Sequence, residues 1–189
     1  MSIYDSDIKN CIEVLRDGGV ILYPTDTVWG LGCDPTNEKA VEKLYNLKEN
    51  FDSRQMLILV DNVSRIHSYV SEFPELAYQL IDYADSPLTI IYDSAKNLAK
   101  NIIANDGSIG IRVSNDEFNK NLIFRFRKPI ASTSANIHGK PTPLNYSEIT
   151  EDIIKKADYV VNYRRDDTTK SQSSKIIKLK NSGEIRIIR

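Results

Sequence analysis

The chain has 189 residues, with 25 basic and 26 acidic side chains and a formal net charge of -1. Its 41% hydrophobic and 27% charged residues are typical of a globular protein and exclude a disordered chain. Two cysteines without a CxxC spacing or a nearby histidine exclude a disulfide scaffold and argue against a zinc site. No apolar run approaches the ~20 residues of a membrane span, and the polar first ten residues do not resemble a signal peptide. We therefore expect a single domain over residues 1–189, in the cytoplasm and not associated with a membrane.

The charge is unevenly distributed along the chain. Residues 155–189 carry ten basic and four acidic side chains, so this end is basic and the remainder is acidic. Cations gathered on one face attract phosphates whatever the net charge. The alternative is an ordinary solvated surface, which is the usual explanation of a charge run.

Periodicity and turn residues predict an alternation of helices and strands. In chain order, the predicted elements are helix 5–17, strand 20–23, helix 37–47, strand 56–60, helix 74–83, strands 88–92 and 109–113, helix 116–126, strand 129–132, helix 148–157, and strands 159–162, 176–179 and 185–188. Thr36 is a candidate cap for the second helix. The pattern predicts an α/β (α+β) fold around a mixed, twisted sheet.

A polar segment, Pro24-Thr25-Asp26-Thr27-Val28-Trp29-Gly30-Leu31-Gly32, follows the first predicted strand. Hydroxyls, a carboxylate and backbone near glycines can together bind a small polar ligand, and loops after buried strands of α/β sheets are common ligand sites. The alternative is a tight turn, because Pro and Gly punctuate turns. No Gly-Lys-Ser/Thr follows, which excludes a Walker A loop.

A second polar segment, Ser132-Thr133-Ser134-Ala135-Asn136, follows the strand predicted at 129–132 and continues to Pro141. Small side chains allow an anion to approach the backbone N–H groups, as in phosphate-binding nests. The alternative is a Ser- and Asn-rich surface turn. Its place directly after a buried strand favours a functional site.

Isolated cations complete the candidate site. Arg112 lies within an apolar strand, where a guanidinium requires a carboxylate, a ligand or solvent, and an edge strand with Arg112 facing outward is the alternative. Lys48 ends the second helix and Arg54 follows in the next loop. No nucleophile–base pair is evident. Hydroxyls and cations without a nucleophile suit chemistry on phosphates, where catalysis is mainly positioning and charge neutralisation.

The order and spacing of these segments resemble the YrdC-like family. The resemblance rests on the run from Gly19 to Gly32, Lys48, Pro87-Leu88-Thr89, Gly110-Ile111-Arg112-Val113 and Ser132 to Asn136. It extends from about Cys11 to the C-terminus and corresponds to the short, single-domain form. It implies a twisted α/β sheet around a concave, cationic groove.

The resemblance implies a threonylcarbamoyl-AMP synthase, which is a nucleotidyltransferase. The substrates would be L-threonine, bicarbonate or CO₂, and ATP with Mg²⁺, and the products would be threonylcarbamoyl-AMP and pyrophosphate. Partner transferase proteins would then modify adenosine 37 of tRNA.

The resemblance also implies the site residues. The expected threonine-binding residues are Thr25, Thr27, Arg112, Ser132 and Ser174. The expected ATP-binding residues are Lys48, Asn50, Arg54, Ser108, Ser134, Asn136, Thr142 and Arg189. No catalytic nucleophile or base and no protein ligand to a metal is expected.

Three positions depart from the family pattern. Asn50 replaces an arginine that binds ATP, and Arg54 is a candidate to supply the missing charge. Leu59 stands where some members have a threonine-binding histidine, and Ser173-Ser174-Lys175 replaces Ser-Thr-Val. Two alternatives therefore stay open: a module that binds double-stranded RNA or tRNA, and a paralogue without synthase activity.

Overall fold

The computed structural model describes residues 3–49 and 56–189. The strands are β1 (Ile21–Tyr23), β2 (Gly30–Cys33), β3 (Leu57–Val60), β4 (Leu88–Tyr92), β5 (Ile109–Val113), β6 (Ile130–Ser134), β7 (Tyr159–Val160), β8 (Lys175–Leu179) and β9 (Ile185–Ile187). The helices are α1 (Asp5–Arg16), α2 (Glu38–Leu47), α3 (Leu76–Asp82), α4 (Glu117–Phe126) and α5 (Glu151–Lys156). Short 3-10 turns lie at Val63–Ser68 and Tyr146–Glu148. Within these residues, no helix combines the length and the apolar character needed to cross a bilayer.

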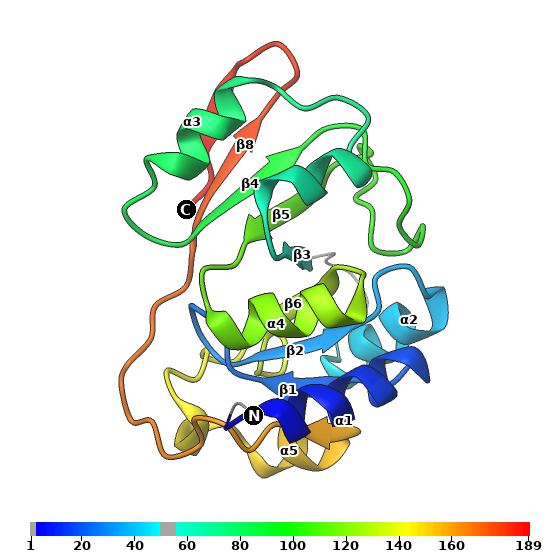
Figure 1. Cartoon of the computed structure of the whole chain (residues 1–189), viewed down its shortest axis with the longest axis vertical. Helices are drawn as coiled ribbons and strands as arrows, with labels where there is room; N and C mark the ends of the chain where they lie inside the picture. The colour runs from blue at the N-terminus through cyan, green and yellow to red at the C-terminus, as the bar shows by residue number, and fades with distance from the viewer. Residues whose placement is uncertain (1–2, 50–55) are drawn as a thin grey trace.

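All nine strands found in the described residues form one mixed sheet, in the order β7-β1-β2-β6-β3-β5-β4-β8-β9. The pairs β1–β7, β3–β5 and β4–β8 are parallel, and the remaining five pairs are antiparallel. The helices pack against this sheet (Figure 1). The prediction of a mixed sheet with flanking helices is thereby confirmed.

The helices bury the apolar faces that their spacing predicts. On α1, the buried positions Ile8, Cys11, Ile12 and Leu15 follow the 3.6-residue period. In Figure 1, α1 and α4 lie side by side in front of the strands of the lower half. The prediction of Thr36 as the α2 cap is wrong: the side chain of Asn37 accepts hydrogen bonds from the N–H groups of the first turn.

The sequence prediction missed one strand. Gly30–Cys33 forms β2, which pairs with β1 and with β6 at the place where a loop was expected. Glycine weakens an isolated strand, so this segment carries no local strand signal. Its glycines serve close packing instead: a Cβ atom on Gly32 would lie 2.8 Å from Cε1 of Tyr23.

The segment from 161 to 174 carries the chain from β7 to β8, near the opposite edge of the sheet (Figure 1). Buried Asp7 on α1 holds its start, accepting hydrogen bonds from the Tyr159 hydroxyl at 2.6 Å and from the Tyr163 N–H at 3.0 Å. These and two bonds from Asn162 lower the pKa of Asp7 although burial alone raises it. The crossing brings β8 beside β4.

Substituting Gly32 by alanine is expected to destabilise the fold by about 1–3 kcal/mol, because the new methyl group meets the Tyr23 ring and Ile130 Cγ2, both at 2.8 Å. Gly110 in β5 is the matched control: its nearest neighbour, Leu57 Cβ, lies at 3.3 Å, so Gly110→Ala should cost less. Urea unfolding of the two variants measures the difference. Equal stability of the two variants would show that the Tyr23 ring does not need the space above Gly32.

Candidate functional site

A cavity of about 730 Å³ lies against the middle of the sheet. It takes its walls from the loop after β1, the end of α2, strands β3 to β6, the strand β8 and the last two residues of the chain. Eleven residues predicted for the site line it: Thr25, Thr27, Lys48, Ser108, Arg112, Ser132, Ser134, Asn136, Thr142, Ser174 and Arg189. The fold thus gathers residues that are up to 164 positions apart, from 25 to 189, around one space.

Two predicted residues are not placed. Asn50 and Arg54 lie outside the described residues, so the substitution of the family arginine stays a question of sequence. Leu59, which stands where some members have a histidine, is fully buried in β3 and is not part of the cavity lining.

Arg112 is buried near the centre of the sheet. It lies on β5 between Leu59 of β3 and Thr89 of β4, so the alternative of an outward-facing edge residue is wrong. Its Nη2 forms an ion pair with Asp26 Oδ1 at 3.2 Å, and both side chains are less than 10% exposed. Nε of Arg112 has no hydrogen-bond partner among the described residues. A buried guanidinium with spare donors facing a cavity fits an anionic ligand.

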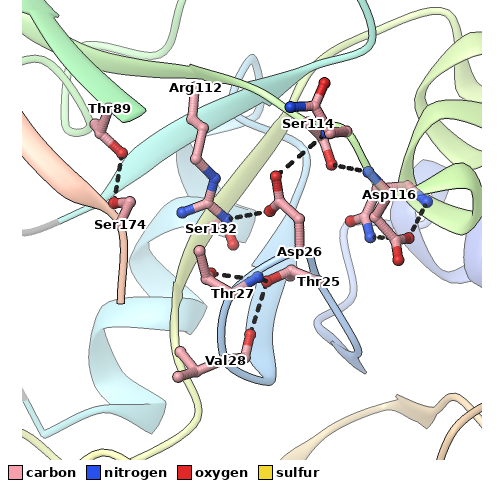
Figure 2. A network of polar contacts seen from close by, with 12 residues as sticks. Thr25, Asp26, Thr27, Val28, Thr89, Arg112, Ser114, Asp116, Ser132 and Ser174 are labelled. Carbon is pink, nitrogen blue, oxygen red and sulfur yellow. Dashed lines mark hydrogen bonds and ion pairs between the residues drawn. The ribbon is translucent and has the colours of Figure 1, made fainter. Parts of the chain in front are cut away.

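The loop that carries Asp26 is fixed at several points. The Asn115 N–H donates to Asp26 Oδ2 at 3.2 Å, and Asn119 of α4 donates to the Pro24 carbonyl at 2.9 Å. Arg164 donates to the Thr25 carbonyl at 3.3 Å. Figure 2 shows the Arg112 guanidinium between Asp26 on one side and Ser174 on the other. The loop therefore holds Asp26 against Arg112 before any ligand arrives.

Hydrogen bonds within this loop determine which of its two threonine hydroxyls donates and which accepts (Figure 2). The Thr25 hydroxyl donates to the Val28 carbonyl at 2.8 Å and accepts from the Thr27 N–H at 3.0 Å. Because a hydroxyl has one proton, Thr27 must be the donor in the 2.9 Å contact between the two hydroxyls. Thr25 is thereby saturated, and Thr27 Oγ1 keeps lone pairs that accept from a ligand.

The second polar segment lies partly on β6, which extends two residues beyond the predicted strand. Ser132, Thr133 and Ser134 all line the cavity, and Ser132 and Ser134, two positions apart, lie on the same face of the strand. The Ser134 hydroxyl donates to Asn136 Oδ1 at 2.5 Å. The polar segment therefore begins on rigid sheet and turns away only at its end.

Lys48 follows α2 and joins it to this segment. Its Nζ donates to the Ser134 carbonyl at 2.8 Å, and its carbonyl accepts from the His138 N–H at 3.0 Å. Burial lowers the pKa of Lys48 to about 8, because it disfavours the charged form. An anion beside Lys48 would favour the charged form and raise this pKa.

Two further anchors shape the far wall. The Ser108 hydroxyl donates to Asp106 Oδ1 at 2.5 Å, while Lys178 donates to Asp106 Oδ2 at 2.7 Å. These bonds hold the pKa of Asp106 well below its usual range. Ser108 therefore offers its oxygen to a ligand as an acceptor.

The C-terminal residues reach the cavity through Ser174. Its hydroxyl lies 2.8 Å from that of Thr89, and its carbonyl accepts from Arg189 Nη2 at 3.2 Å. The site prediction did not include Thr89, Asp26 or Asp106. Thr89 shared a signal with Arg112, a polar residue within an apolar strand, whereas the partners Asp26 and Asp106 become apparent only from distances.

Most of the basic C-terminal charge is neutralised locally. Six of the ten cations between 155 and 189 form ion pairs with described carboxylates: Lys155, Lys156, Arg164, Lys175, Lys178 and Lys180. Surface pairs of this kind reduce the field that a phosphate backbone would meet.

Sequence comparison connects the chain with known proteins. The family model Sua5_yciO_yrdC, described as "Telomere recombination", matches residues 13–189. A protein named threonylcarbamoyl-AMP synthase from Pseudoalteromonas translucida is 35% identical over 82% of this chain and 85% of its own length. A putative threonylcarbamoyl-AMP synthase from Methanocaldococcus jannaschii is 32% identical over 97% of this chain and 87% of its own length.

Solved structures show the same fold. Sua5 of P. abyssi, determined in complex with L-threonine, superposes with a TM-score of 0.83 at 25% identity, over 95% of this chain. The match covers 52% of that Sua5 chain, about half its length. YciO of E. coli superposes with a TM-score of 0.83 at 22% identity, over 97% of this chain and 88% of its own, which supports the fold alone. The sequence matches and the shared sheet together place the chain in the Sua5/YciO/YrdC family.

Proposed function

We propose that the protein is a threonylcarbamoyl-AMP synthase, which makes L-threonylcarbamoyladenylate and pyrophosphate from L-threonine, bicarbonate or CO₂, and ATP. The observation that carries the proposal is Arg112, a buried cation in the cavity whose Nε has no partner among the described residues. The names of the curated relatives and the threonine complex of Sua5 support it.

The amino acid end of the proposed site is built on Arg112. Arginine binds a carboxylate through two parallel hydrogen bonds, and Ser132 adds a hydroxyl on the neighbouring wall. Thr27 Oγ1 is an acceptor and suits the amine N–H of the same ligand. A carboxylate and an amine attached to the same carbon atom describe an α-amino acid. In this proposal Thr25 orients Thr27 and makes no ligand contact of its own, because its hydroxyl is saturated.

The nucleotide end lies toward Lys48 and the end of β6. Lys48 supplies charge for the phosphates, with Asn136, Thr142 and Arg189 on the surrounding wall. The hydroxyls of Ser108 and Ser134 donate hydrogen bonds to Asp106 and Asn136, so toward a ligand their oxygens act as acceptors. They therefore suit ribose hydroxyls or the adenine amino group better than phosphate oxygens.

The chemistry needs no covalent intermediate with the protein. The neutral amine of threonine attacks the carbon of CO₂ and loses a proton to solvent, which gives a carbamate. A carbamate oxygen then attacks the α-phosphorus of ATP, and the bond to the β-phosphate oxygen breaks to release pyrophosphate. The residues of the cavity hold the two substrates in line and neutralise phosphate charge.

Mg²⁺ belongs to the ATP substrate in this proposal. Magnesium keeps several waters and binds through substrate phosphates. Over residues 3–49 and 56–189, no group of three or more His, Cys, Asp or Glu side chains is arranged to hold a metal ion. The ion would neutralise charge on the pyrophosphate that leaves.

The product would serve tRNA threonylcarbamoylation by partner transferases in the cytoplasm. The RNA-binding alternative needs free cations on a surface, and the six C-terminal ion pairs leave fewer of them. The buried Arg112 favours a small anionic ligand over a nucleic acid backbone.

The proposal predicts pyrophosphate release from ATP only when both threonine and bicarbonate are present, with threonylcarbamoyl-AMP detected by mass spectrometry. Pyrophosphate release without threonine, or RNA binding without turnover, would contradict the synthase.

Replacing Arg112 by lysine keeps a cation beside Asp26 but removes the planar fork. We expect the KM for threonine to rise at least tenfold, about 1.4 kcal/mol, while the KM for ATP changes much less. Arg65→Lys is the matched control. Arg65 forms an ion pair of 3.1 Å with Asp61, and neither residue lines the cavity. An unchanged threonine KM in Arg112→Lys would refute the carboxylate assignment.

The affinity for ATP is expected to fall as the pH rises from 8 to 9.5. Lys48 has a pKa of about 8 in the free protein, and bound phosphate raises that pKa, so binding takes up a proton in this window. Well below pH 8, where Lys48 is charged in the free protein as well, the affinity should be nearly constant. Calorimetry in two buffers of different ionisation enthalpy measures the uptake, and Lys48→Arg should abolish it. Equal proton uptake in that variant would assign the effect to another group.

A further inference from the structure

Tyr23 reaches across a whole strand to contact the site. It lies on β1, β2 is the next strand, and Ser132 lies on β6 beyond it. The ring is fully buried, and its hydroxyl donates to Ser132 Oγ at 2.8 Å. Gly32 of β2 leaves the space, since a Cβ atom there would lie 2.8 Å from Tyr23 Cε1.

The contact fixes which way the Ser132 hydroxyl points. A phenol is more acidic than an aliphatic alcohol and is the better donor, so Ser132 Oγ accepts. Burial raises the pKa of Tyr23 well above its ordinary value, which keeps the donor proton in place. Ser132 then retains its own proton, for which no hydrogen bond to a described residue is found, and it lines the cavity.

Three other hydroxyls that line the cavity are arranged in the opposite sense. The hydroxyls of Thr27, Ser108 and Ser134 donate hydrogen bonds to Thr25, Asp106 and Asn136 respectively. Among these four hydroxyls, only Ser132 remains a donor, and it lies on the wall beside Arg112. The Ser132 hydroxyl and the Arg112 guanidinium can therefore donate to the same ligand group.

We infer that Tyr23 is a positioning residue that holds the Ser132 hydroxyl as a hydrogen-bond donor to the substrate carboxylate bound by Arg112. The inference rests on the proposed function, because it takes an amino acid as the ligand. Tyr23 itself does not line the cavity and touches no substrate. Its effect passes through Ser132 alone.

Tyr23→Phe keeps the ring and removes the hydroxyl. Without the donor, the Ser132 proton is free to turn away from the ligand, so the KM for threonine should rise about three- to tenfold. The kcat and the KM for ATP should stay near wild type. Tyr92→Phe is the matched control: Tyr92 is 1% exposed in the same sheet, and its hydroxyl has no partner among the described residues. It should change none of these constants.

A double-mutant cycle separates positioning from a general structural effect. In a Ser132→Ala background, Tyr23→Phe should cause no further loss of threonine affinity, because the group it positions is gone. An additive loss, or a parallel rise in the KM for ATP, would show a structural role and overturn the inference.

The two proposals fail in different ways. If the wild-type protein neither binds nor uses threonine, the proposed function is wrong. If the wild type uses threonine and Tyr23→Phe uses it with the same KM, the function stands and the role of Tyr23 is refuted.

Discussion

The ion pair between Arg112 and Asp26, 3.2 Å between Nη2 and Oδ1, places a charged group in the middle of an otherwise apolar strand. Removing both charges from water is costly, and one carboxylate with imperfect hydrogen bonding compensates only in part. Oδ1 of Asp26 and Nε of Arg112 both lack a hydrogen bond of good geometry to a described residue. Arg112 can therefore bind a second anion, and the surrounding structure holds the Arg112–Asp26 pair in place when no such anion is bound.

Several remote parts of the chain contribute to that preparation. Asn119 on α4 and Arg164 in the crossing segment both hold backbone carbonyls of the loop that carries Asp26. Arg164 also pairs with Asp116 at 3.0 Å, which ties the crossing segment to the start of α4. The same crossing lets Ser174 close the other side of Arg112. The position of one guanidinium thus depends on helix, loop and C-terminal segment together.

Much of the fold follows from local signals. The apolar spacing of α1 and the apolar runs of β4 and β5 predicted those elements within a few residues of where they lie. The strand β2 escaped because its sequence is half glycine, which disfavours strands locally. Here the missing side chains make room for the Tyr23 ring, a requirement set by a neighbouring strand. The end of β6 was also missed, because its last residues are polar and were predicted to form a loop.

The sequence by itself determined the family, the order of most elements and many of the polar residues around the cavity, since motifs and periodicity are local properties. Only the tertiary structure decided that β5 is central, that Asp26 is the partner of Arg112, and which hydroxyls donate and which accept. Those facts depend on contacts such as Tyr23 with Ser132, 109 positions apart, and Thr89 with Ser174, 85 apart. A hydroxyl has one proton to donate in a hydrogen bond, and the fold determines which acceptor lies within reach of it.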